Sequence, residues 1–325
     1  MKVVIYRRYG SPDVLRFEEL PKPAPTQKEV LVRIHASSVN AADLDLLRGR
    51  FMIRPGGLFR PRYKILGSDI AGVVESVGPD VTGLRPGAEV FADLTEFGFG
   101  AFAEYVSVPA AAVTRKPAGL SFEQAAAVPS AGGVALLNLQ AFGPIEPGQS
   151  VLINGAGGGM GTFAVQIATA AGAEVTGVDS AGKLEMIRSI GADHVIDYAE
   201  DDFAQTGNTY DRIIDMVATR SIYACRKALS PEGIYLAVGG SMRKMLQVAM
   251  LGPVISKTDG KMLGMVMEYP NITHLEALRE LVEAGKVTPI IDRDYSLADV
   301  AEALRYLESG HVRGKLVISV DREGD

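Results

Sequence analysis

Three glycines recur at every third position in VLINGAGGGMGTFAVQIA, the segment from Val151 to Ala168. An apolar run precedes them and a helical pattern follows. Glycine allows the chain to turn sharply, to approach a phosphate pair closely and to pack the new helix against the sheet. An anion then lies at the helix N-terminus, where N–H groups and the helix dipole favour negative charge. The pattern predicts a dinucleotide pyrophosphate site at Gly155, Gly158, Gly159, Met160 and Gly161.

A glycine-rich run alone is weak evidence, because an ordinary tight turn between strand and helix also uses glycines. The sequence around it favours the nucleotide site. After the helix ends near Gly172, the segment Glu174 to Val178 is typical of a second strand. That strand is followed by Asp179, near the distance at which an acidic residue that binds ribose is expected.

Composition limits the classes of function. The chain has 325 residues, of which 47% are hydrophobic, and a net charge of −6, which suit a well-packed protein of two domains. With no long basic run, neither nucleic acid nor an anionic membrane surface is an expected partner. We expect a small-molecule, hydrophobic substrate. The N-terminus lacks the apolar core of a signal peptide, and Ala125 to Leu137 falls short of a membrane span, so a cytoplasmic location is expected.

Cysteine usage excludes two further classes of site. Cys225 is the single cysteine, so neither an intrachain disulfide nor a site with several thiolates can form. It shares a helical face with Ile222 and Leu229, which predicts a buried core thiol and not a nucleophile.

The pattern of strands and helices changes along the chain. Residues 1–122 are rich in short strands separated by Pro and Gly, which predicts a β-rich domain. Residues 123–268 alternate strand and helix, which is typical of an α/β fold with a doubly wound parallel sheet. Residues 269–325 hold two helices and a last strand, KLVISV, that we expect to complete the first domain.

These segments together resemble the medium-chain dehydrogenase/reductase superfamily, in its zinc-free branch of quinone oxidoreductases and NAD(P)-dependent alcohol dehydrogenase-like proteins. The resemblance covers nearly the whole chain and rests on YGSPDVLRFEELPKPAP, VLVRIHASSVNAAD, LGSDIAGVVESVGPDVTGLRPGAEVF, GAFAEYV, the glycine turn, GADHVIDY and GHVRGKLVISV. It implies a Rossmann-type NAD(P)-binding domain at 123–268 and a GroES-like catalytic domain at 1–122 and 269–325. It also suggests a homodimer.

Zinc-dependent members of the superfamily hold the metal at three places that here match Asn40, Ser68 and roughly Ala131. These side chains do not supply the thiolate and imidazole ligands that zinc prefers, so we expect no zinc. The histidines are scattered, and each is more simply a structural or surface residue: His35, His194, His274 and His311.

The resemblance implies hydride transfer between a nicotinamide and a substrate in the cleft between two domains. An asparagine at position 40 resembles that of quinone reductases, where it lies near the substrate, so Asn40 is the candidate catalytic donor; a turn-stabilising role is the alternative. For Asp43 and Arg48 a structural ion pair is expected. Two positions depart from the family pattern: Asp45 replaces a tyrosine that lines the site, and Val134 replaces a threonine near the cofactor.

The residues after the second strand point to two different cofactors. Asp179 would accept both ribose hydroxyls of NAD and repel a 2′-phosphate, whereas Ser180 and Lys183 favour NADP. The family favours NADP(H) over NAD(H), and the resemblance therefore implies NADP(H). Four more residues are expected at the cofactor: Tyr198 near the adenine, Gly239 and Gly240 on the nicotinamide side, and Lys315 closing the cleft.

Three functions stay open. The first is a zinc-independent NAD(P)H-dependent oxidoreductase that reduces quinones or other electron-poor enones and carbonyls. The second is a metal-free alcohol or aldehyde dehydrogenase, and the third is a cofactor-sensing binding protein with little turnover. Methionines such as Met245, Met250 and Met265 could line an apolar substrate pocket or pack in a core or a dimer.

Overall fold

The computed structural model describes residues 1–50, 60–256 and 260–321. By its internal contacts the chain forms two compact units. Unit 1 comprises Met1–Gly133, Pro270–Ala284 and Pro289–Asp325, and unit 2 comprises Val134–Tyr269 and Gly285–Thr288. The division falls inside helix α3 (Pro129–Gln140), beyond the composition change at residue 122, because the preceding helix α2 (Phe122–Ala126) packs on strands of unit 1.

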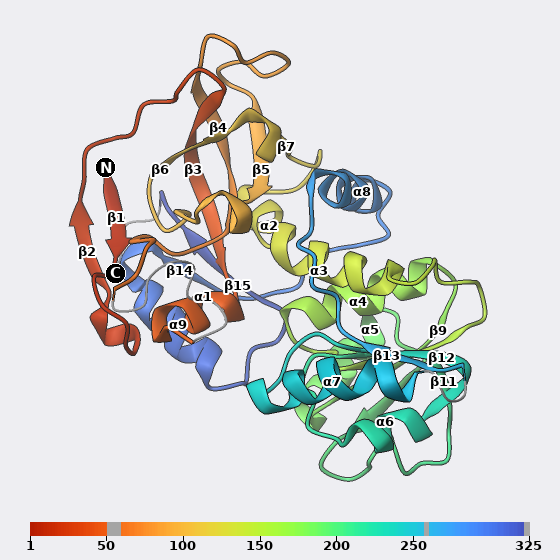
Figure 1. Cartoon of the computed structure of the whole chain (residues 1–325). Coiled ribbons are helices and arrows are strands. Elements are labelled where there is room, and N and C mark those ends of the chain that lie inside the picture. The colour runs from red at the N-terminus through yellow and green to blue at the C-terminus, as the bar shows by residue number, and fades with distance from the viewer. Residues whose placement is uncertain (51–59, 257–259, 322–325) are drawn as a thin grey trace. The chain divides into compact units, whose positions relative to one another are not determined.

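Unit 1 is built on a seven-stranded sheet with the order β14-β15-β3-β4-β5-β7, and β6 also pairs with β3 (Figure 1). A separate pair, β1 and β2, is antiparallel. The strands are β1 (Lys2–Ile5), β2 (Arg16–Glu19), β3 (Glu29–Val39), β4 (Asp69–Val77), β5 (Glu89–Asp93), β6 (Tyr105–Pro109), β7 (Thr114–Arg115), β14 (Ile291–Ser296) and β15 (Lys315–Ser319).

The last strand of the chain belongs to this sheet. β15 pairs antiparallel with β3, opposite Val39 to Ala36, and parallel with β14. The helices of unit 1 are α1 (Ala41–Arg48), α2, α8 (Ile272–Glu283) and α9 (Val300–Glu308). α8 ends just before Gly285, which has φ +68°, a left-handed conformation that glycine adopts readily.

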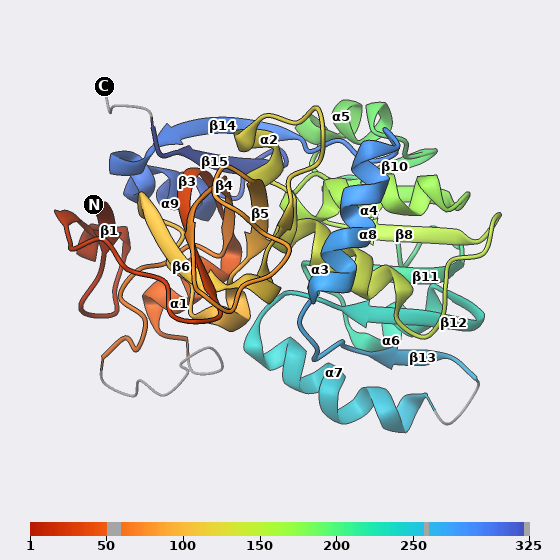
Figure 2. The same cartoon turned by 90° about the horizontal axis from the view of Figure 1, so that it is seen from above.

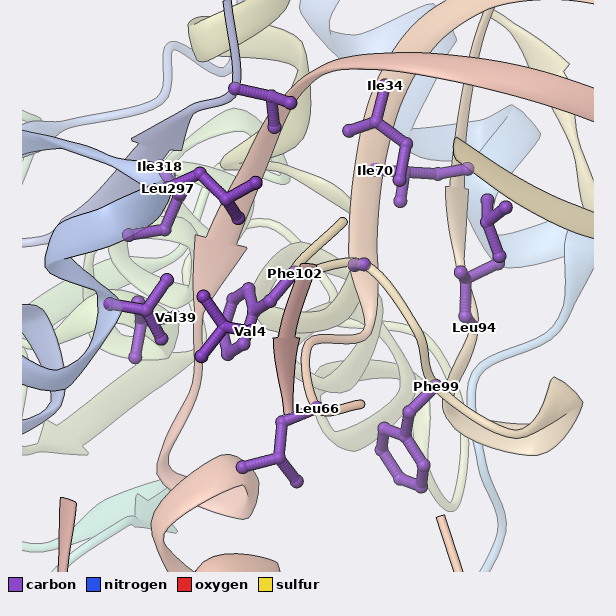
Figure 3. Packing of buried hydrophobic residues seen from close by; sticks show 14 of the residues in the cluster. Val4, Ile34, Val39, Leu66, Ile70, Leu94, Phe99, Phe102, Leu297 and Ile318 are labelled. Carbon is purple, nitrogen blue, oxygen red and sulfur yellow. The ribbon is translucent and has the colours of Figure 1, made fainter. Parts of the chain in front are cut away.

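The core of unit 1 follows from alternation along β3. Val30, Val32 and Ile34 are fully buried, and Arg33 between them points outward, as the two-residue period of a strand requires. Figure 3 shows Ile34 and Ile70 gathered with other aliphatic side chains, and Phe102 beside Val4. Phe102 has no exposed surface.

Unit 2 is a six-stranded sheet with the order β10-β9-β8-β11-β12-β13, and every pairing is parallel. In chain order the strands run 3-2-1-4-5-6, the order of a dinucleotide-binding sheet, which confirms the predicted doubly wound fold. The strands are β8 (Ser150–Asn154), β9 (Glu174–Asp179), β10 (His194–Asp197), β11 (Tyr210–Asp215), β12 (Leu229–Ala237) and β13 (Met262–Gly264).

Helices cover both faces of this sheet. They are α4 (Gly159–Ala170), α5 (Leu184–Ser189), α6 (Ile222–Lys227) and α7 (Met242–Ile255). In Figure 1 α4 lies above the strands and α6 below them, and Figure 2 shows the strands side by side from β10 to β13. Cys225 on α6 is fully buried, and burial raises its pKa to about 12, so the expected core thiol is confirmed.

Truncating Phe102 to alanine tests the core of unit 1. We expect Phe102→Ala to lower the free energy of unfolding by about 3–5 kcal/mol, because it removes a buried ring and leaves a cavity. The same change at Phe17, whose side chain is about half exposed, is expected to cost less than about 1 kcal/mol. Urea denaturation measures both, and equal losses for the two variants would contradict this description of the core.

Candidate functional site

The glycine-rich turn in unit 2 connects β8 to α4. Gly155 has φ +91°, and Gly158, in extended conformation, is the N-cap residue of α4. A Cβ atom on Gly161 would lie 2.1 Å from the carbonyl oxygen of Gly155, so a side chain cannot fit where the helix crosses the turn. The first three residues of the helix, Gly159 to Gly161, carry N–H groups that precede its first internal hydrogen bonds. This backbone fits a pyrophosphate.

The turn lies at the place where a parallel sheet binds ligands. The chain leaves β8 for β9 on one side and returns to β11 on the other, so the carboxyl ends of β8 and β11 form the topological switch point. Asn154 at the end of β8 donates to Asp215 Oδ1 at the end of β11, over 2.8 Å. The two loops that leave the switch point are therefore held by one buried hydrogen bond.

Asp215 also positions the loop after β11. It is fully buried and accepts the N–H groups of Val217 and Ala218, at 3.1 and 2.7 Å, and the hydroxyl of Tyr235, at 3.0 Å. The loop after β12 packs closely against it, since a Cβ atom on Gly239 would lie 2.3 Å from the carbonyl oxygen of Met216. Gly240 follows with φ +116°. Two of the predicted cofactor residues thus lie at the carboxyl edge of the sheet.

Asp179, at the end of β9, faces the glycine turn. Its Oδ2 accepts the N–H of Gly157 at 2.9 Å, and its Oδ1 accepts the N–H of Ser180 at 2.8 Å. The ammonium of Lys183 lies 3.5 Å from Oδ1, and both side chains are about nine-tenths buried. The Lys183 chain covers Gly157, where an added Cβ would lie 2.6 Å from Lys183 Cδ. The carboxylate charge is therefore balanced within the protein.

Tyr198 lies just after the neighbouring strand β10. Its backbone N–H donates to the carbonyl oxygen of Asp179 at 3.2 Å, and its side chain is 57% exposed. The structure thus brings the predicted residues of unit 2 to one edge of one sheet. Their contact with a cofactor stays a prediction.

Unit 1 holds a buried polar cluster around Asp69, the first residue of β4. Asp69 has no exposed surface, and its Oδ2 accepts the hydroxyl of Ser38 at 2.5 Å and the amide of Asn40 at 2.9 Å. Its Oδ1 accepts the backbone N–H of Ser130 at 2.8 Å. The ammonium of Lys315 lies 3.4 Å from Oδ2, with its side chain 2% exposed. These four donors satisfy a carboxylate that water cannot reach.

The side-chain amide of Asn40 makes hydrogen bonds through both its nitrogen and its oxygen to neighbouring side chains. Its amide nitrogen donates to Ser68 Oγ at 3.1 Å as well as to Asp69, and its Oδ1 accepts from Lys315 Nζ at 2.5 Å. Its backbone N–H donates to Asp43 Oδ2, because Asn40 is also the N-cap residue of α1. The structure therefore joins the catalytic candidate Asn40 to Lys315, which the sequence assigned to the cofactor. Both roles stay predictions.

The expected ion pair between Asp43 and Arg48 is wrong. Asp43 occupies the third position of α1 and faces back to the helix start, where it accepts the N–H groups of Asn40 and Gly67. Burial raises its pKa to about 7. Arg48, at the other end of the helix, pairs with Glu308 on α9. Asp45 pairs with Arg50 at 2.9 Å.

The three positions expected to match zinc ligands carry side chains that do not bind zinc. The Asn40 amide and the Ser68 hydroxyl bond to each other, and Ala131 is a buried methyl group on α3. In the described ranges, which omit 51–59, 257–259 and 322–325, no three His, Cys, Asp or Glu side chains gather to hold a metal. An amide, a hydroxyl and a methyl do not form a zinc site.

Two central acids were missed by the sequence reasoning. Asp69 and Asp93 face each other across the β4–β5 pair, and Ser38 faces Asp69 across the β3–β4 pair. The available signal was an acid at the start of an apolar strand, DIAGVV, and another at the end of EVFAD. An acidic residue at the end of a strand is common where it is exposed, so the sequence pattern alone does not single it out. Only the strand register shows that Asp69 and Asp93 lie opposite each other.

Other expectations concern the molecule as a whole. Within the described part of the chain, none of the helices has both the length and the apolar character needed to cross a membrane. The methionines named above differ in environment: Met245 packs against the core of unit 2, whereas Met250 is 73% exposed.

Two family models match the sequence. One describes an alcohol dehydrogenase GroES-like domain and matches residues 26–118, and the other describes a zinc-binding dehydrogenase and matches residues 190–318. Relatives match along almost the full length. A 2-methylene-furan-3-one reductase of Solanum lycopersicum is 32% identical over 98% of this chain and 79% of its own.

Two further relatives carry related names. A chloroplastic quinone oxidoreductase of Triphysaria versicolor is 33% identical over 98% of both chains. A chloroplastic NADPH-dependent alkenal/one oxidoreductase of Arabidopsis thaliana is 31% identical over 98% of this chain and 79% of its own.

A solved structure matches both units. The quinone oxidoreductase of Coxiella burnetii superposes with a TM-score of 0.87 at 29% identity, covering 98% of this chain and 99% of that one. The match agrees with the parallel sheet of unit 2 and the β-rich sheet of unit 1 described above. This chain is an oxidoreductase enzyme and belongs to the medium-chain dehydrogenase/reductase superfamily, in the branch that contains the quinone oxidoreductases.

Proposed function

We propose that this chain is a zinc-independent, NADPH-dependent reductase of quinones or other electron-poor enones. The main support for this proposal is the group of hydrogen-bond donors around Asp69. Where zinc-dependent relatives place metal ligands, this chain has an amide and a hydroxyl that bond to each other, Asn40 and Ser68. Beyond the hydride of the cofactor, reduction of a conjugated carbonyl requires only hydrogen-bond donors and a proton, whereas oxidation of a simple alcohol calls for a metal or a tuned base.

The cofactor fits the glycine turn of unit 2. Gly155 and Gly161 leave the backbone open to a pyrophosphate, and the start of α4 offers N–H groups to it. When bound, the nicotinamide supplies a hydride, and the protein orients the reactants and excludes water. The names of the relatives, a furanone reductase, an alkenal/one oxidoreductase and a quinone oxidoreductase, support a conjugated carbonyl substrate.

The preference for NADPH rests on Lys183. Its ammonium lies beside Asp179 and balances the negative charge that would otherwise repel a 2′-phosphate. The oxygens of Asp179 already accept N–H groups of Gly157 and Ser180, so the carboxylate is held toward the turn. In this proposal Ser180 and Lys183 contact the phosphate, and Tyr198 packs near the adenine.

We propose that Asn40 acts near the reacting carbonyl by positioning Ser68, because both of its own amide hydrogens are already donated, to Ser68 and to Asp69. Its amide holds Ser68 Oγ as an acceptor, so the Ser68 hydroxyl hydrogen is left to be donated elsewhere. Lys315 in turn fixes the amide through Oδ1. The proposed donor is therefore oriented before a substrate arrives, which is the arrangement that stabilises a developing oxyanion.

The function is tested with metal-stripped protein. We expect oxidation of NADPH with a quinone or a cyclic enone present, at a rate unchanged by a chelator. Loss of the nicotinamide absorbance follows the reaction. Measurable NADPH binding with no turnover on a panel of quinones, enones and aldehydes would contradict the proposal, and chelator-resistant cofactor reduction by an alcohol would favour a dehydrogenase.

The variant Lys183→Met tests the cofactor preference while keeping the packing over Gly157. We expect the Kd for NADPH to rise about 10–100-fold, since a charge-assisted hydrogen bond is worth about 1.5–3 kcal/mol, with little change for NADH. Fluorescence titration measures both constants. The exposed Lys227→Met on α6 is the control, and an equal rise for both cofactors would argue against a phosphate contact.

The variant Asn40→Ala tests the proposed positioning of the Ser68 donor. We expect kcat/KM for an enone to fall about 100-fold with the Kd for NADPH unchanged, since removing one such donor costs about 10²–10³ in rate. Losing the N-cap also costs about 1 kcal/mol of stability, which a thermal melt reports. Asn208→Ala at an exposed loop is the control. Unchanged kcat/KM in a folded Asn40→Ala protein would remove Asn40 from the site.

A further inference from the structure

One buried carboxyl group joins the start of α1 to the segment that precedes β4. Asp43 lies in the first turn of α1, where its Oδ2 accepts the backbone N–H of Asn40 at 2.8 Å. Its Oδ1 accepts the backbone N–H of Gly67 at 2.9 Å. The side chain is 1% exposed, so water does not compete for either oxygen. A single side chain therefore fixes the spacing between two segments that are distant in the sequence.

These two segments carry the proposed donor and the amide that positions it. Asn40 is the N-cap residue of α1, and its side-chain amide donates to Ser68 Oγ at 3.1 Å. Ser68 follows directly after Gly67 in the chain. A change in the spacing between the backbones of Asn40 and Gly67 therefore also changes the contact between the amide and the hydroxyl.

The rest of the second segment is bound to other parts of unit 1. The carbonyl oxygen of Gly67 accepts the N–H of Ala101 at 3.1 Å, and that of Ser68 accepts the N–H of Leu94 at 2.7 Å. Among the hydrogen bonds of the described residues, the one from Gly67 to Asp43 ties this backbone to α1. Without it, the contact between the two segments would depend on the side-chain hydrogen bond to Ser68 alone.

Both partners of Asp43 are hydrogen-bond donors, so the charge of its carboxyl group matters. An ionised carboxyl group accepts at both oxygens, whereas a neutral one carries an O–H donor on one of them. An O–H that faces an N–H leaves a buried donor without an acceptor, which is unfavourable. Asp43 therefore holds both N–H groups fully only in its ionised form.

The surroundings of Asp43 bring its titration close to neutral pH. Burial raises its pKa to about 7 and Asp69 on β4 adds to the rise, whereas the two N–H groups and Lys315 on β15 oppose it. Tyr6, beyond the end of β1, also faces the carboxyl group, and burial raises the pKa of this phenol, so it stays neutral. Helix α9 packs against α1 and brings Glu308, which pairs with the other end of α1.

We propose that Asp43 is a positioning residue that, as a carboxylate, holds the Asn40 amide against Ser68 and so directs the Ser68 hydroxyl hydrogen toward the substrate carbonyl. Loss of the charge releases one of the two N–H groups and loosens the contact between Asn40 and Ser68. Asp43 acts through these two residues and not by contact with the substrate. This inference rests on the proposed reductase function and adds a group that makes its donor dependent on pH.

Asp43→Asn keeps the shape of the side chain and replaces one accepting oxygen with an NH₂ group. We expect kcat for cyclohex-2-enone to fall at least about tenfold, since a misplacement of about 1 Å can cost about 100-fold. KM and the Kd for NADPH should change less than about twofold, because the donor acts on charge that develops in the transition state. Asp80→Asn at an exposed loop is the matched control and should leave all three constants unchanged.

The pH profile separates positioning from a merely structural role. In the unaltered enzyme, kcat/KM for cyclohex-2-enone should fall as the pH drops through about 7, where Asp43 takes up a proton. The fall should be absent from Asp43→Asn, whereas a loss of stability alone would lower the melting temperature and leave the profile unchanged. Asp93→Asn is the second comparison, because burial also raises the pKa of Asp93 to about 7, and its profile should keep the fall.

An NMR titration of the full chain tests the same contacts without turnover. In protein labelled with ¹⁵N at asparagine, the signals of Asn40 are those that Asn40→Ala lacks. We expect its backbone N–H and its side-chain NH₂ signals to shift together, with a midpoint near pH 7, and neither to shift in Asp43→Asn. Thermal melts show whether each variant is folded, and the titration of the unaltered chain does not depend on them.

The outcomes separate this inference from the function it rests on. A backbone signal of Asn40 that titrates without the side-chain signal, or no titration across neutral pH, would overturn the positioning role. So would an unchanged kcat and pH profile in folded Asp43→Asn, or loss of the fall in Asp93→Asn instead. If the unaltered chain reduces no enone, the proposed function fails, and the NMR titration still decides whether Asp43 holds the amide.

Discussion

The ion pair between Lys315 and Asp69 organises unit 1. Both side chains are buried, and removing either partner would leave an uncompensated charge, which costs about 3–5 kcal/mol. The pair joins β15, from the end of the chain, to β4, and both strands flank β3. Lys315 also holds the Asn40 amide at the start of α1. The interaction that links β15 to β4 therefore also holds the amide of Asn40.

The same carboxylate lies opposite a second acidic residue. Asp69 faces Asp93 across the β4–β5 pair, and like charges at such a position repel. Burial and this neighbour raise the pKa of Asp93 to about 7.

Much of unit 2 could be predicted from the sequence because its signals are local. Glycine spacing, strand runs and the order of strand and helix depend on neighbouring residues, and they predicted the turn at Gly155 and the parallel sheet. The cluster of unit 1 could not be predicted, since Asn40, Asp69, Asp93 and Lys315 come from four distant segments. Only strand register and the return of β15 bring them together. The expected pair of Asp43 with Arg48 failed for another reason: both lie on α1, and their spacing is not the three or four residues that brings side chains of a helix together.

Isotope transfer tests the central claim most directly. Metal-stripped protein would be mixed with cyclohex-2-enone and NADPH carrying deuterium at both C4 positions, and the product analysed by mass spectrometry and NMR. The account predicts one deuterium at the β-carbon of the saturated ketone. NADPH bound at the turn without labelled ketone, or deuterium at the carbonyl carbon of an alcohol product, would contradict it.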